Sequence, residues 1–407
     1  MPSLRSDLIG IAPTGALGTA FFYYLTSELS HAEDSCVFLS RSGSHSSEAV
    51  RQSGQLRFQT MRGEVRVASN KVWAGTFTDA WNAGIMPRWV LICSNTDQIL
   101  DYISEWIDLI VLQNEQNLLF PSASEVPALV LTANGIYFQR VRQILIEKLE
   151  EAELLGKLPD LWPDVMPKVV SRLIRGVTMQ TSVRHGEGAD AIYCPGPSNI
   201  TTLAGGDRGL RRGICADATR RGARFEDAGE LPPTRVEFQK AFMNLNSNLL
   251  GLISAISSDG SFRPLTLKEI YTADFCIRGA ELIRHVLSIG KAVHAFAPEE
   301  SAEPIIAHVF EVAQRFPDHV PSSIQWIEQQ VRHGNISNEI PPTEKWLLSP
   351  LLHYAKNAGL KKEHDFLEAL QQQLQQKLTL AKTHYDTKHT PGARAPSPSS
   401  SEDASQS

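Results

Sequence analysis

The sequence predicts an α/β domain with a parallel sheet, followed by an all-α domain. In the first half, short apolar runs alternate with longer amphipathic or polar segments, the pattern of β-α-β units whose strands are buried on both faces. After Pro233, six segments carry helical periodicity, separated by proline and glycine. The 407 residues suffice for two domains, each with its own apolar core.

The first strand candidate is the apolar run of residues 8–12, followed by a glycine-rich turn at residues 13–18 and a helix candidate. Further apolar runs at residues 36–40, 89–93 and 128–132 predict more strands of the parallel sheet, and residues 144–158 predict a helix. Residues 177–180 and 191–194 suggest an antiparallel pair. The helix candidates of the second domain are residues 236–256, 267–289, 304–315, 322–333, 343–357 and 364–380.

Changes in composition set the predicted boundaries. Residues 206–233 are rich in glycine, arginine, aspartate and proline, so we interpret them as a partly mobile excursion between the domains. The N-terminal domain then covers residues 1–205 and the helical substrate and dimerisation domain residues 234–384. Residues 385–407 are Ser/Pro-rich with almost no apolar content, which predicts a disordered tail.

Charge and cysteine content exclude several classes of protein. A formal charge of −6 gives no global positive field for nucleic acid or an anionic membrane. The local arginine patch of residues 208–224 also contains acidic residues, so we interpret it as a solvated loop. No apolar stretch approaches the roughly 20 residues of a membrane span. The five scattered cysteines form no CxxC, which argues against disulfides or a metal site and favours reduced thiols in the cytoplasm.

The turn after the first strand has the arrangement that binds a dinucleotide. Strand, glycine-rich turn and helix together present backbone N–H groups and a helix N-terminus to a pyrophosphate. Here Thr14, Gly15, Ala16, Leu17 and Gly18 are the candidate residues; Gly15 would permit close backbone approach and Gly18 tight helix–strand packing. Pro13 occupies the usual first glycine position, so the pattern is PxGxxG.

Arg41 indicates which dinucleotide is bound. It lies 23 residues after Gly18, at the end of the second strand candidate. An acidic residue there would bond the ribose of NAD, whereas an arginine accommodates the 2′-phosphate of NADP. The sequence therefore predicts a Rossmann-type domain for NADP(H).

The helix that opens the second domain carries Lys240, Asn244 and Asn248 at i, i+4 and i+8, so these side chains share one face. Apolar residues cover much of the remaining surface, and polar groups on such a helix are costly to bury without partners. A solvated polar stripe is the alternative interpretation.

The combination of short motifs resembles the ketopantoate reductases. KxxxNxxxN is joined by Asn134-Gly135 after an apolar run and by Pro342-Thr343-Glu344, in the same order as in that family. With the glycine turn and Arg41, the resemblance extends from residue 8 to about residue 380. It implies NADPH-dependent reduction of a small 2-keto acid, ketopantoate or an analogue, to the 2-hydroxy acid. Helical domains of this kind often pair, so a homodimer is one alternative, and the sequence leaves the oligomeric state open.

The resemblance also implies a role for each matching residue. Lys240 falls on the general acid, and Glu344 on the glutamate that orients the substrate hydroxyl and the lysine. Asn134 falls beside the nicotinamide and the substrate. Asn244 and Asn248 fall on the two helix amides, and Ser323 on the serine that holds the substrate carboxylate.

Four departures from the family pattern leave other functions open. Pro13 replaces a glycine, Asn95 stands where many members carry a lysine, and 21 residues separate Ser323 from Glu344, more than usual. The arginine-rich excursion is also longer than expected between the domains. One alternative is a catalytically silent NADP(H)-binding sensor or scaffold. Another is a related dehydrogenase working in the opposite direction, with His285 or His294 as its catalytic base.

Overall fold

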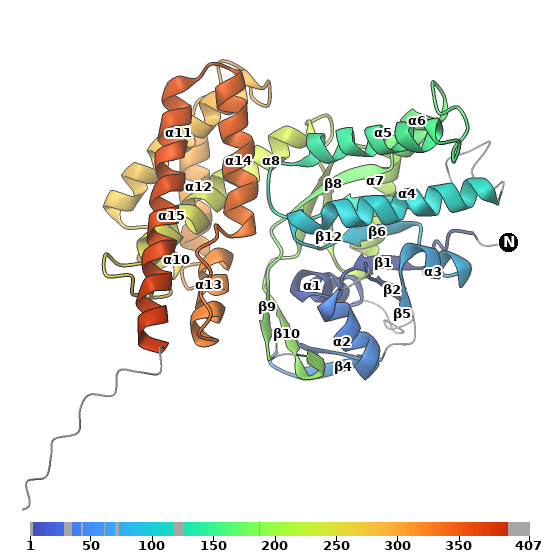
Figure 1. The fold of residues 1–407 in the computed structure, drawn as a ribbon, viewed down its shortest axis with the longest axis horizontal. Coiled ribbons are helices and arrows are strands. Elements are labelled where there is room, and N and C mark those ends of the chain that lie inside the picture. The colour runs from blue at the N-terminus through green and yellow to red at the C-terminus, as the bar shows by residue number, and fades with distance from the viewer. Residues whose placement is uncertain are drawn as a thin grey trace, which may run out of the picture. The chain divides into compact units, whose positions relative to one another are not determined.

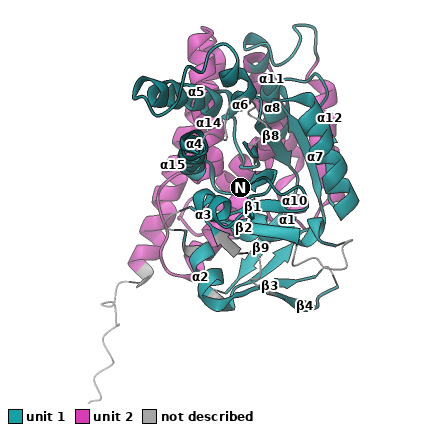
Figure 2. Ribbon diagram, turned by 90° about the vertical axis from the view of Figure 1, so that its right-hand side faces the viewer, with its two compact units in different colours: residues 1–241, 290–300 teal, residues 242–289, 301–407 magenta. Residues whose placement is uncertain are grey.

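The structure is a computed structural model that describes residues 3–27, 35–41, 44–60, 62–69, 73–116, 126–186 and 188–389. The chain divides into two compact units (Figure 2). Unit 1 comprises Met1–Ala241 and Gly290–Glu300, and unit 2 comprises Phe242–Ile289 and Ser301–Ser407.

Unit 1 contains an eight-stranded sheet in the order β12-β11-β8-β7-β6-β1-β2-β5 (Figure 1). The strands are β1 (Ile9–Ala12), β2 (Cys36–Leu39), β5 (Trp73–Gly75), β6 (Trp89–Ile92), β7 (Ala128–Leu131), β8 (Leu173–Thr178), β11 (Ile200–Ala204) and β12 (Arg224–Asp227). Six neighbouring strands of this sheet, in the order β8-β7-β6-β1-β2-β5, are mutually parallel. The next strand, β11, is antiparallel to β8. Because β1 lies between β2 and β6, the order of these six strands is that of a dinucleotide-binding sheet. The predicted Rossmann-type domain is confirmed.

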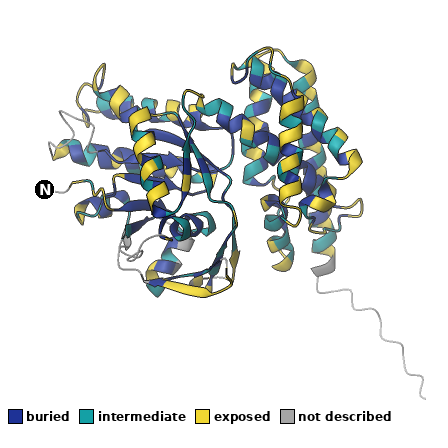
Figure 3. Cartoon of the chain, turned by 180° about the vertical axis from the view of Figure 1, so that it is seen from behind, coloured by how far each residue is buried: buried dark blue, intermediate teal, exposed yellow. Residues whose placement is uncertain are grey.

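Helices cover both faces of this sheet, which is why every residue of β1, β2, β6 and β7 is buried (Figure 3). α1 (Ala16–Leu25) and α7 (Arg208–Arg221) pack together on one face. The opposite face carries α3 (Phe77–Asn82), α4 (Ile99–Glu115), α5 (Phe138–Leu154) and α6 (Val165–Val170). Cys36 and Cys93 are buried as predicted, and all five cysteines are free thiols.

A second, four-stranded sheet in unit 1 has the order β4-β3-β10-β9. It consists of β3 (Gln55–Gln59), β4 (Val65–Ser69), β9 (Ser182–His185) and β10 (Ile192–Pro195), and α2 (His45–Ser53) precedes it. β9 and β10 are antiparallel, whereas Val177 lies in β8 of the large sheet and pairs with β11. The predicted antiparallel pair of residues 177–180 and 191–194 is therefore wrong in its first strand.

Residues 206–233 do not form the predicted mobile excursion or solvated loop, because they contribute α7 and the edge strand β12 to unit 1. Asp207 caps α7 by accepting from the N–H of Leu210 at 2.7 Å. Arg211 is buried and donates to Asp227 at 2.8 Å, and Arg221 is buried and donates to Asp217 at 3.1 Å. Glycine, aspartate and arginine are common in loops, so the composition predicted a loop. In the structure these residue types cap a helix and form internal ion pairs, which composition alone does not reveal.

Unit 2 is helical in its described part, as predicted. The helix α8 (Pro233–Asn244) begins in unit 1 and continues without a break as a π-helix, η5 (Leu245–Leu250), and then as α9 (Gly251–Ala255). The remaining helices are α10 (Leu267–Ile270), α11 (Ala273–Ala292), α12 (Glu303–Arg315), α13 (Ser322–Arg332), α14 (Pro342–Asn357) and α15 (Lys361–His389). None of the helices among the described residues is both long enough and apolar enough to span a membrane.

The unit boundaries differ from the predicted ones. The first lies inside α8, between Ala241 and Phe242, instead of at residue 234. Residues Gly290–Glu300 return to unit 1, where Glu300 accepts from Arg235 at 2.6 Å and Phe296 contacts Phe238. The last helix extends to His389, beyond the expected start of the tail at residue 385, and residues 390–407 lie outside the described residues.

Candidate active site

The glycine turn follows β1 at the carboxyl edge of the large sheet, where α/β sheets bind ligands. Gly15 is the N-cap of α1, which has no side-chain cap and no acidic residue in its first turn. A Cβ atom at Gly15 would meet no protein atom within 4 Å, and its φ of −82° suits any residue. Neither backbone conformation nor packing requires glycine here, so the space beside it suits a ligand.

Gly18 has the opposite surroundings. A Cβ atom there would lie 2.2 Å from the carbonyl oxygen of Pro13 and 3.1 Å from Ile11. Glycine at this position therefore permits close packing of α1 against β1, as the sequence predicted. Thr14 is fully buried and its hydroxyl donates to Ser47 at 3.4 Å, so its side chain belongs to the protein interior.

Arg41 lies two residues after β2, at the same carboxyl edge. Its guanidinium forms an ion pair with Asp101, near the start of α4, at 3.2 Å. Asp101 is more than half exposed, so this pair is weak in water and can yield to a bound phosphate. Asn95, where many ketopantoate reductases carry a lysine, is exposed just after β6.

Asn134 is half-buried in the turn after β7. The next residue, Gly135, has φ of 128°, which side chains rarely permit, and this accounts for the Asn-Gly pair. The carbonyl oxygen of Asn134 accepts a hydrogen bond from Thr96 Oγ1 at 2.6 Å. Thr96 begins the short 3-10 helix η2 (Thr96–Gln98) after β6, so this hydrogen bond joins the ends of two neighbouring strands.

Lys240 lies near the end of the unit 1 part of α8 and is partly buried. Its Nζ contacts the Met179 Sδ at 3.4 Å, a weak acceptor that hardly stabilises an ammonium group. Burial, together with the positive charge of Arg175, lowers the pKa of Lys240 to about 8. A lysine with such a pKa exchanges a proton readily near neutral pH.

Asn248, Ser323 and Glu344 lie in contact in unit 2, and we call them the carboxyl cluster. Asn248 Oδ1 accepts from the backbone N–H of Ser323 at 3.2 Å, at the start of α13. The Ser323 hydroxyl donates to Glu344 Oε1 at 2.6 Å. The hydroxyl hydrogen of Ser323 is therefore directed to Glu344.

Glu344 is completely buried in the first turn of α14. Burial raises the pKa of Glu344 to about 7, against the opposing effect of the Ser323 hydrogen bond. Its second oxygen, Oε2, is buried and has no hydrogen-bond partner among the described residues. A carboxyl group with one open oxygen and a pKa near neutrality is suited to bind or exchange a proton with a polar ligand.

The remaining helix amides lie close to the π-helix. Asn244 is buried at the end of α8, and its Nδ2 has no partner among the described residues. Asn248 lies inside η5, whose wider turns differ from the α-helical geometry that would stack Lys240, Asn244 and Asn248 at i, i+4 and i+8. Insertions of this kind in helices are frequent at functional sites.

Sequence reasoning missed several polar residues of unit 1. Arg175 is 1% exposed in the middle of β8 and forms a buried ion pair with Glu237 of α8 at 2.8 Å. Gln180, just after β8, is buried, and neither polar atom of its side chain has a partner among the described residues. The run that contains both residues indicated only a strand, and nothing in the sequence marked either side chain as buried.

The histidines of the dehydrogenase alternative contact none of the predicted site residues in the described structure. His285 stacks on Phe366 with ring centroids 4.2 Å apart, and burial lowers its pKa. His294 is exposed just after α11.

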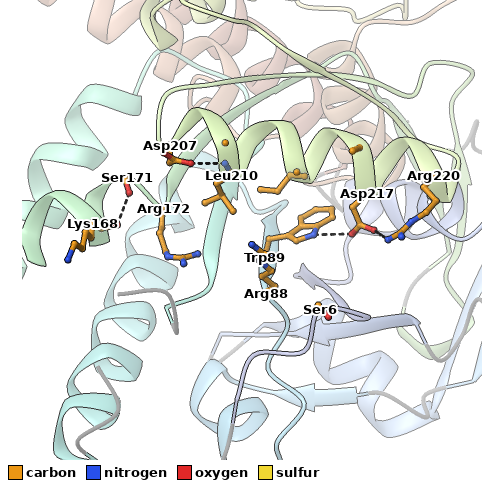
Figure 4. A pocket seen from close by; sticks show the side chains of 14 residues that line it. Ser6, Arg88, Trp89, Lys168, Ser171, Arg172, Asp207, Leu210, Asp217 and Arg220 are labelled. Atoms are coloured by element: carbon orange, nitrogen blue, oxygen red, sulfur yellow. Dashed lines mark hydrogen bonds and ion pairs between the residues drawn. The ribbon is translucent and has the colours of Figure 1, made fainter. Parts of the chain in front are cut away.

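A cavity of about 830 Å³ lies at the opposite, amino edge of the sheet (Figure 4). Trp89 at the start of β6 and Arg172 just before β8 line it, together with the face of α7 that carries Gly209 and Gly213. Its lining includes none of the residues predicted for the site. The glycine turn and Asn134 lie at the other end of the same strands, so this cavity is a separate feature.

No family model matches the sequence, and no curated protein matches it. Solved structures do match. D-mandelate dehydrogenase with NADH and anilino(oxo)acetate superposes with a TM-score of 0.61 and 15% identity, over 91% of this chain and 99% of that one. A ketopantoate reductase from Ralstonia eutropha JMP134 gives 0.57 and 13%, over 91% and 99%. A ketopantoate reductase from Staphylococcus aureus, described as dimeric and kinetically cooperative, gives 0.54 and 14%, over 90% and 99%.

At 13–15% identity these comparisons show the fold. The chain has the architecture of these two-domain oxidoreductases, with an N-terminal Rossmann-type domain and a C-terminal helical domain. The structural matches agree with the resemblance found in the sequence motifs.

Proposed function

We propose that this protein is a divergent ketopantoate reductase-like enzyme that uses NADPH to reduce a small 2-keto acid to the 2-hydroxy acid. The observation that carries the proposal is Lys240, a partly buried lysine whose pKa is lowered to about 8. Its Nζ contacts the weak acceptor Met179 Sδ, so the ammonium group is poorly stabilised in the free protein and is suited to give up its proton. The substrate is ketopantoate or an analogue with another side chain.

The residues of the carboxyl edge fit a dinucleotide. The free N–H groups of the first turn of α1, from Ala16 to Gly18, suit a pyrophosphate, and the space beside Gly15 lets it approach. Arg41 would exchange its exposed partner Asp101 for the 2′-phosphate, which favours NADP over NAD. Asn134 would lie beside the nicotinamide. When bound, the cofactor supplies the hydride.

Lys240 acts as the general acid in this proposal. Addition of hydride to the carbonyl carbon of a 2-keto acid places negative charge on the carbonyl oxygen, and a nearby ammonium group neutralises and protonates it. A pKa near 8 keeps Lys240 mostly protonated at neutral pH while making it a far stronger acid than an ordinary lysine. Turnover in the direction of reduction should fall as pH rises through about 8, because the ammonium form is lost.

The carboxyl cluster orients the substrate. Glu344 would bind the substrate hydroxyl through its open Oε2 and help to orient Lys240. The orphaned Nδ2 donor of Asn244 suits the substrate carboxylate, and Asn248 holds the start of α13. Because the Ser323 hydroxyl donates to Glu344, we propose that Ser323 positions Glu344 in addition to contacting the carboxylate.

We also propose a homodimer in the cytoplasm. The Staphylococcus aureus reductase of the same fold is described as dimeric. The five free thiols suit a reducing compartment.

The test is an assay of NADPH oxidation with ketopantoate, followed by absorbance, for the wild-type protein and for Lys240→Ala. Gln239→Ala, an exposed neighbour on the same helix, is the matched control. D-mandelate with NAD⁺ or NADP⁺ is assayed in parallel, because the D-mandelate dehydrogenase shares the fold. NADPH binding is measured separately by fluorescence titration.

Turnover that falls about 10²- to 10⁴-fold in Lys240→Ala and persists in Gln239→Ala supports the proposal. Binding of NADPH without turnover of either substrate would favour the alternative of a silent NADP(H)-binding sensor. Absence of binding would contradict the proposed cofactor and would direct attention to Pro13. Turnover unaffected by Lys240→Ala would overturn the assignment of the general acid.

A further inference from the structure

The guanidinium group of Arg175 has an acceptor for each of its five N–H groups. Nε donates to Glu237 Oε1 at 2.8 Å, and Nη1 donates to the carbonyl oxygens of Leu131 and Gly176 at 2.7 and 2.8 Å. Nη2 donates to the carbonyl oxygens of Ala133 and Gly135 at 2.8 and 3.3 Å. A charge in the middle of a buried strand is costly, and this complete set of partners offsets the cost.

Three of these acceptors belong to the turn that carries Asn134. The carbonyl oxygens of Leu131, Ala133 and Gly135 all meet the same guanidinium, so the backbone on both sides of Asn134 is fixed. The carbonyl oxygen of Asn134 itself accepts from Thr96. Arg175 and Thr96 therefore fix the backbone of the turn from which the Asn134 side chain extends.

Glu237 extends the same network to α8. Its Oε1 accepts from Arg175 and from the backbone N–H groups of Tyr137 and Phe138 at 3.2 and 3.1 Å. It thereby caps α5, while the Tyr137 ring lies over the guanidinium at 4.5 Å. Glu237 precedes Lys240 by three residues, less than one turn of the same helix. We call Arg175, Glu237 and the backbone groups they bind the Arg175 network.

We propose that Arg175 is a positioning residue that holds Asn134 and Lys240 in the geometry of the reaction. Its positive charge has a second, electrostatic effect on Lys240. This inference rests on the proposed function for its catalytic consequence. Its structural and electrostatic parts concern unit 1 alone and stand without a substrate.

The electrostatic part follows from the charges near Lys240. Burial is the larger cause of its lowered pKa, and the Arg175 guanidinium is the second. Glu237, three residues before Lys240 on the same helix, forms its ion pair with Arg175 and also accepts from two backbone N–H groups. No described acidic group forms an ion pair with Lys240 that would restore the pKa of an ordinary lysine.

Two variants separate the positioning role of Arg175 from its electrostatic role. Arg175→Lys keeps the positive charge but lacks the planar fork that binds four carbonyl groups. Arg175→Met combined with Glu237→Gln removes both charges of the pair, so no uncompensated buried charge is left. The matched control is Arg211→Met with Asp227→Asn, because Arg211 is likewise buried, donates to Asp227 and donates to the carbonyl oxygens of Gly205 and Gly229.

The first readout needs no substrate. The folded protein is acylated with acetic anhydride at a series of pH values, and mass spectrometry of the peptide that carries Lys240 gives the rate of its acylation. The dependence of this rate on pH gives the midpoint of the Lys240 titration. We expect a midpoint near 8 in the wild type. In Arg175→Met/Glu237→Gln the midpoint should rise by about one pH unit, whereas in Arg175→Lys and in the Arg211 control it should stay near the wild-type value.

The second readout is turnover. Both Arg175 variants should lose about tenfold or more in kcat, with the KM for NADPH nearly unchanged, because Asn134 and Lys240 are misplaced while the phosphate sites stay intact. The Arg211 control should keep kcat. Hydrogen–deuterium exchange over residues 131–138 should increase in the Arg175 variants and not in the control.

An unchanged Lys240 midpoint in Arg175→Met/Glu237→Gln together with full kcat in Arg175→Lys would overturn the inference. A wild-type midpoint at the ordinary lysine value would also overturn it. If the wild type turns over no substrate, the proposed function fails, but the labelling and exchange experiments still decide the positioning and electrostatic roles. If the double variant does not fold, Arg175→Lys decides: faster exchange over residues 131–138 with the midpoint near 8 supports the inference, and wild-type exchange contradicts it.

Discussion

The two units each bury a cluster of polar groups, and the clusters differ in how far their atoms are satisfied. In the Arg175 network of unit 1, every N–H of Arg175 has an acceptor, and Glu237 Oε1 has three donors. In unit 2, Glu344 Oε2 in the carboxyl cluster and the nearby Asn244 Nδ2 are buried without a partner among the described residues. An unpaired buried polar atom costs about 1–3 kcal/mol, so the two arrangements have different consequences for stability.

The difference in hydrogen bonding indicates that the Arg175 network stabilises the fold, whereas the carboxyl cluster can bind a ligand. A network whose partners are all internal has no capacity left for a ligand, and it rigidifies the backbone around it. Open donors and acceptors in a buried cluster are destabilising in the free protein and gain partners when a polar ligand binds. This contrast leads to predictions about the stability of both units and about ligand binding.

The largest effect should come from Glu237→Leu. It leaves the buried guanidinium of Arg175 without its ionic partner, and we expect the free energy of unfolding to fall by about 3–5 kcal/mol. The matched variant in unit 2, Glu344→Leu, should change the same quantity by only about 1 kcal/mol at pH values below 7, where Glu344 is protonated, because it removes an orphaned oxygen along with one hydrogen bond. Urea denaturation followed by circular dichroism, with hydrogen exchange to assign the change to a unit, measures both. Equal losses would refute the distinction between the clusters.

The second prediction concerns pH. The pKa of Glu344 is raised to about 7 in the folded chain, above its unfolded value near 4.3, so the folded state binds the proton more tightly. Stability contributed by the protonated form is complete below about pH 4 and is lost as pH rises through about 7. We expect the wild type to lose about 3–4 kcal/mol across this window relative to Glu344→Gln, which carries no titratable group at this position.

Denaturant unfolding of both proteins at several pH values between 4 and 8 tests this difference. Parallel pH profiles for the wild type and Glu344→Gln would show that Glu344 has an ordinary pKa. A ligand that binds at Oε2 should change the wild-type profile and leave that of the variant unaltered.

The third prediction applies the same contrast to two glycines of one turn. Gly18→Ala should lower the free energy of unfolding by about 1–3 kcal/mol, because the new methyl group meets the carbonyl oxygen of Pro13. Gly15→Ala should leave stability unchanged, because no protein atom lies near the added carbon, and should weaken NADPH binding by about tenfold. Thermal denaturation and fluorescence titration measure the two effects. Unchanged NADPH affinity in Gly15→Ala would mean that the cofactor does not use this turn.

The smallest effect should be that of Arg41→Ala. Loss of the guanidinium should weaken NADPH binding by about 1 kcal/mol, roughly fivefold, and leave NADH binding unaltered. The effect is modest because in the free protein Arg41 already pairs with Asp101. Asp101→Ala, which removes this ion pair, should strengthen NADPH binding slightly. Equal effects on both cofactors would remove the basis for NADP preference.

The sequence predicted the fold correctly at positions where a residue pattern occurs in only one kind of structure. Apolar runs such as that around Val90 predicted buried parallel strands, and Gly18 predicted close helix–strand packing. Residues 206–233 were misjudged because Asp207, Gly222 and the arginines of α7 occur equally in loops, in helix caps and in buried ion pairs. Only the fold shows that Asp227 and Asp217 are their partners.

Part of the candidate site could be predicted from the sequence. Asn248, Ser323 and Glu344 were proposed from their resemblance to known motifs, and the structure brings these three into contact. Arg175 was missed because an arginine inside a strand run gives no sign of its burial, and its partner Glu237 is 62 residues away. The π-helix at η5 also left no trace in the sequence, since its wider turns depend on the packing of the whole helix.

The return of residues Gly290–Glu300 to unit 1 determines how this chain can be dissected. The polypeptide passes between the units at three points, so no single cut yields both units complete. A chain ending at residue 241 would deprive Arg235 of Glu300 and Phe238 of Phe296. A version of unit 1 made by truncation at residue 241 should therefore be unstable, whereas one in which residues 290–300 are rejoined through a short linker should fold. Both units should therefore be studied within one intact chain.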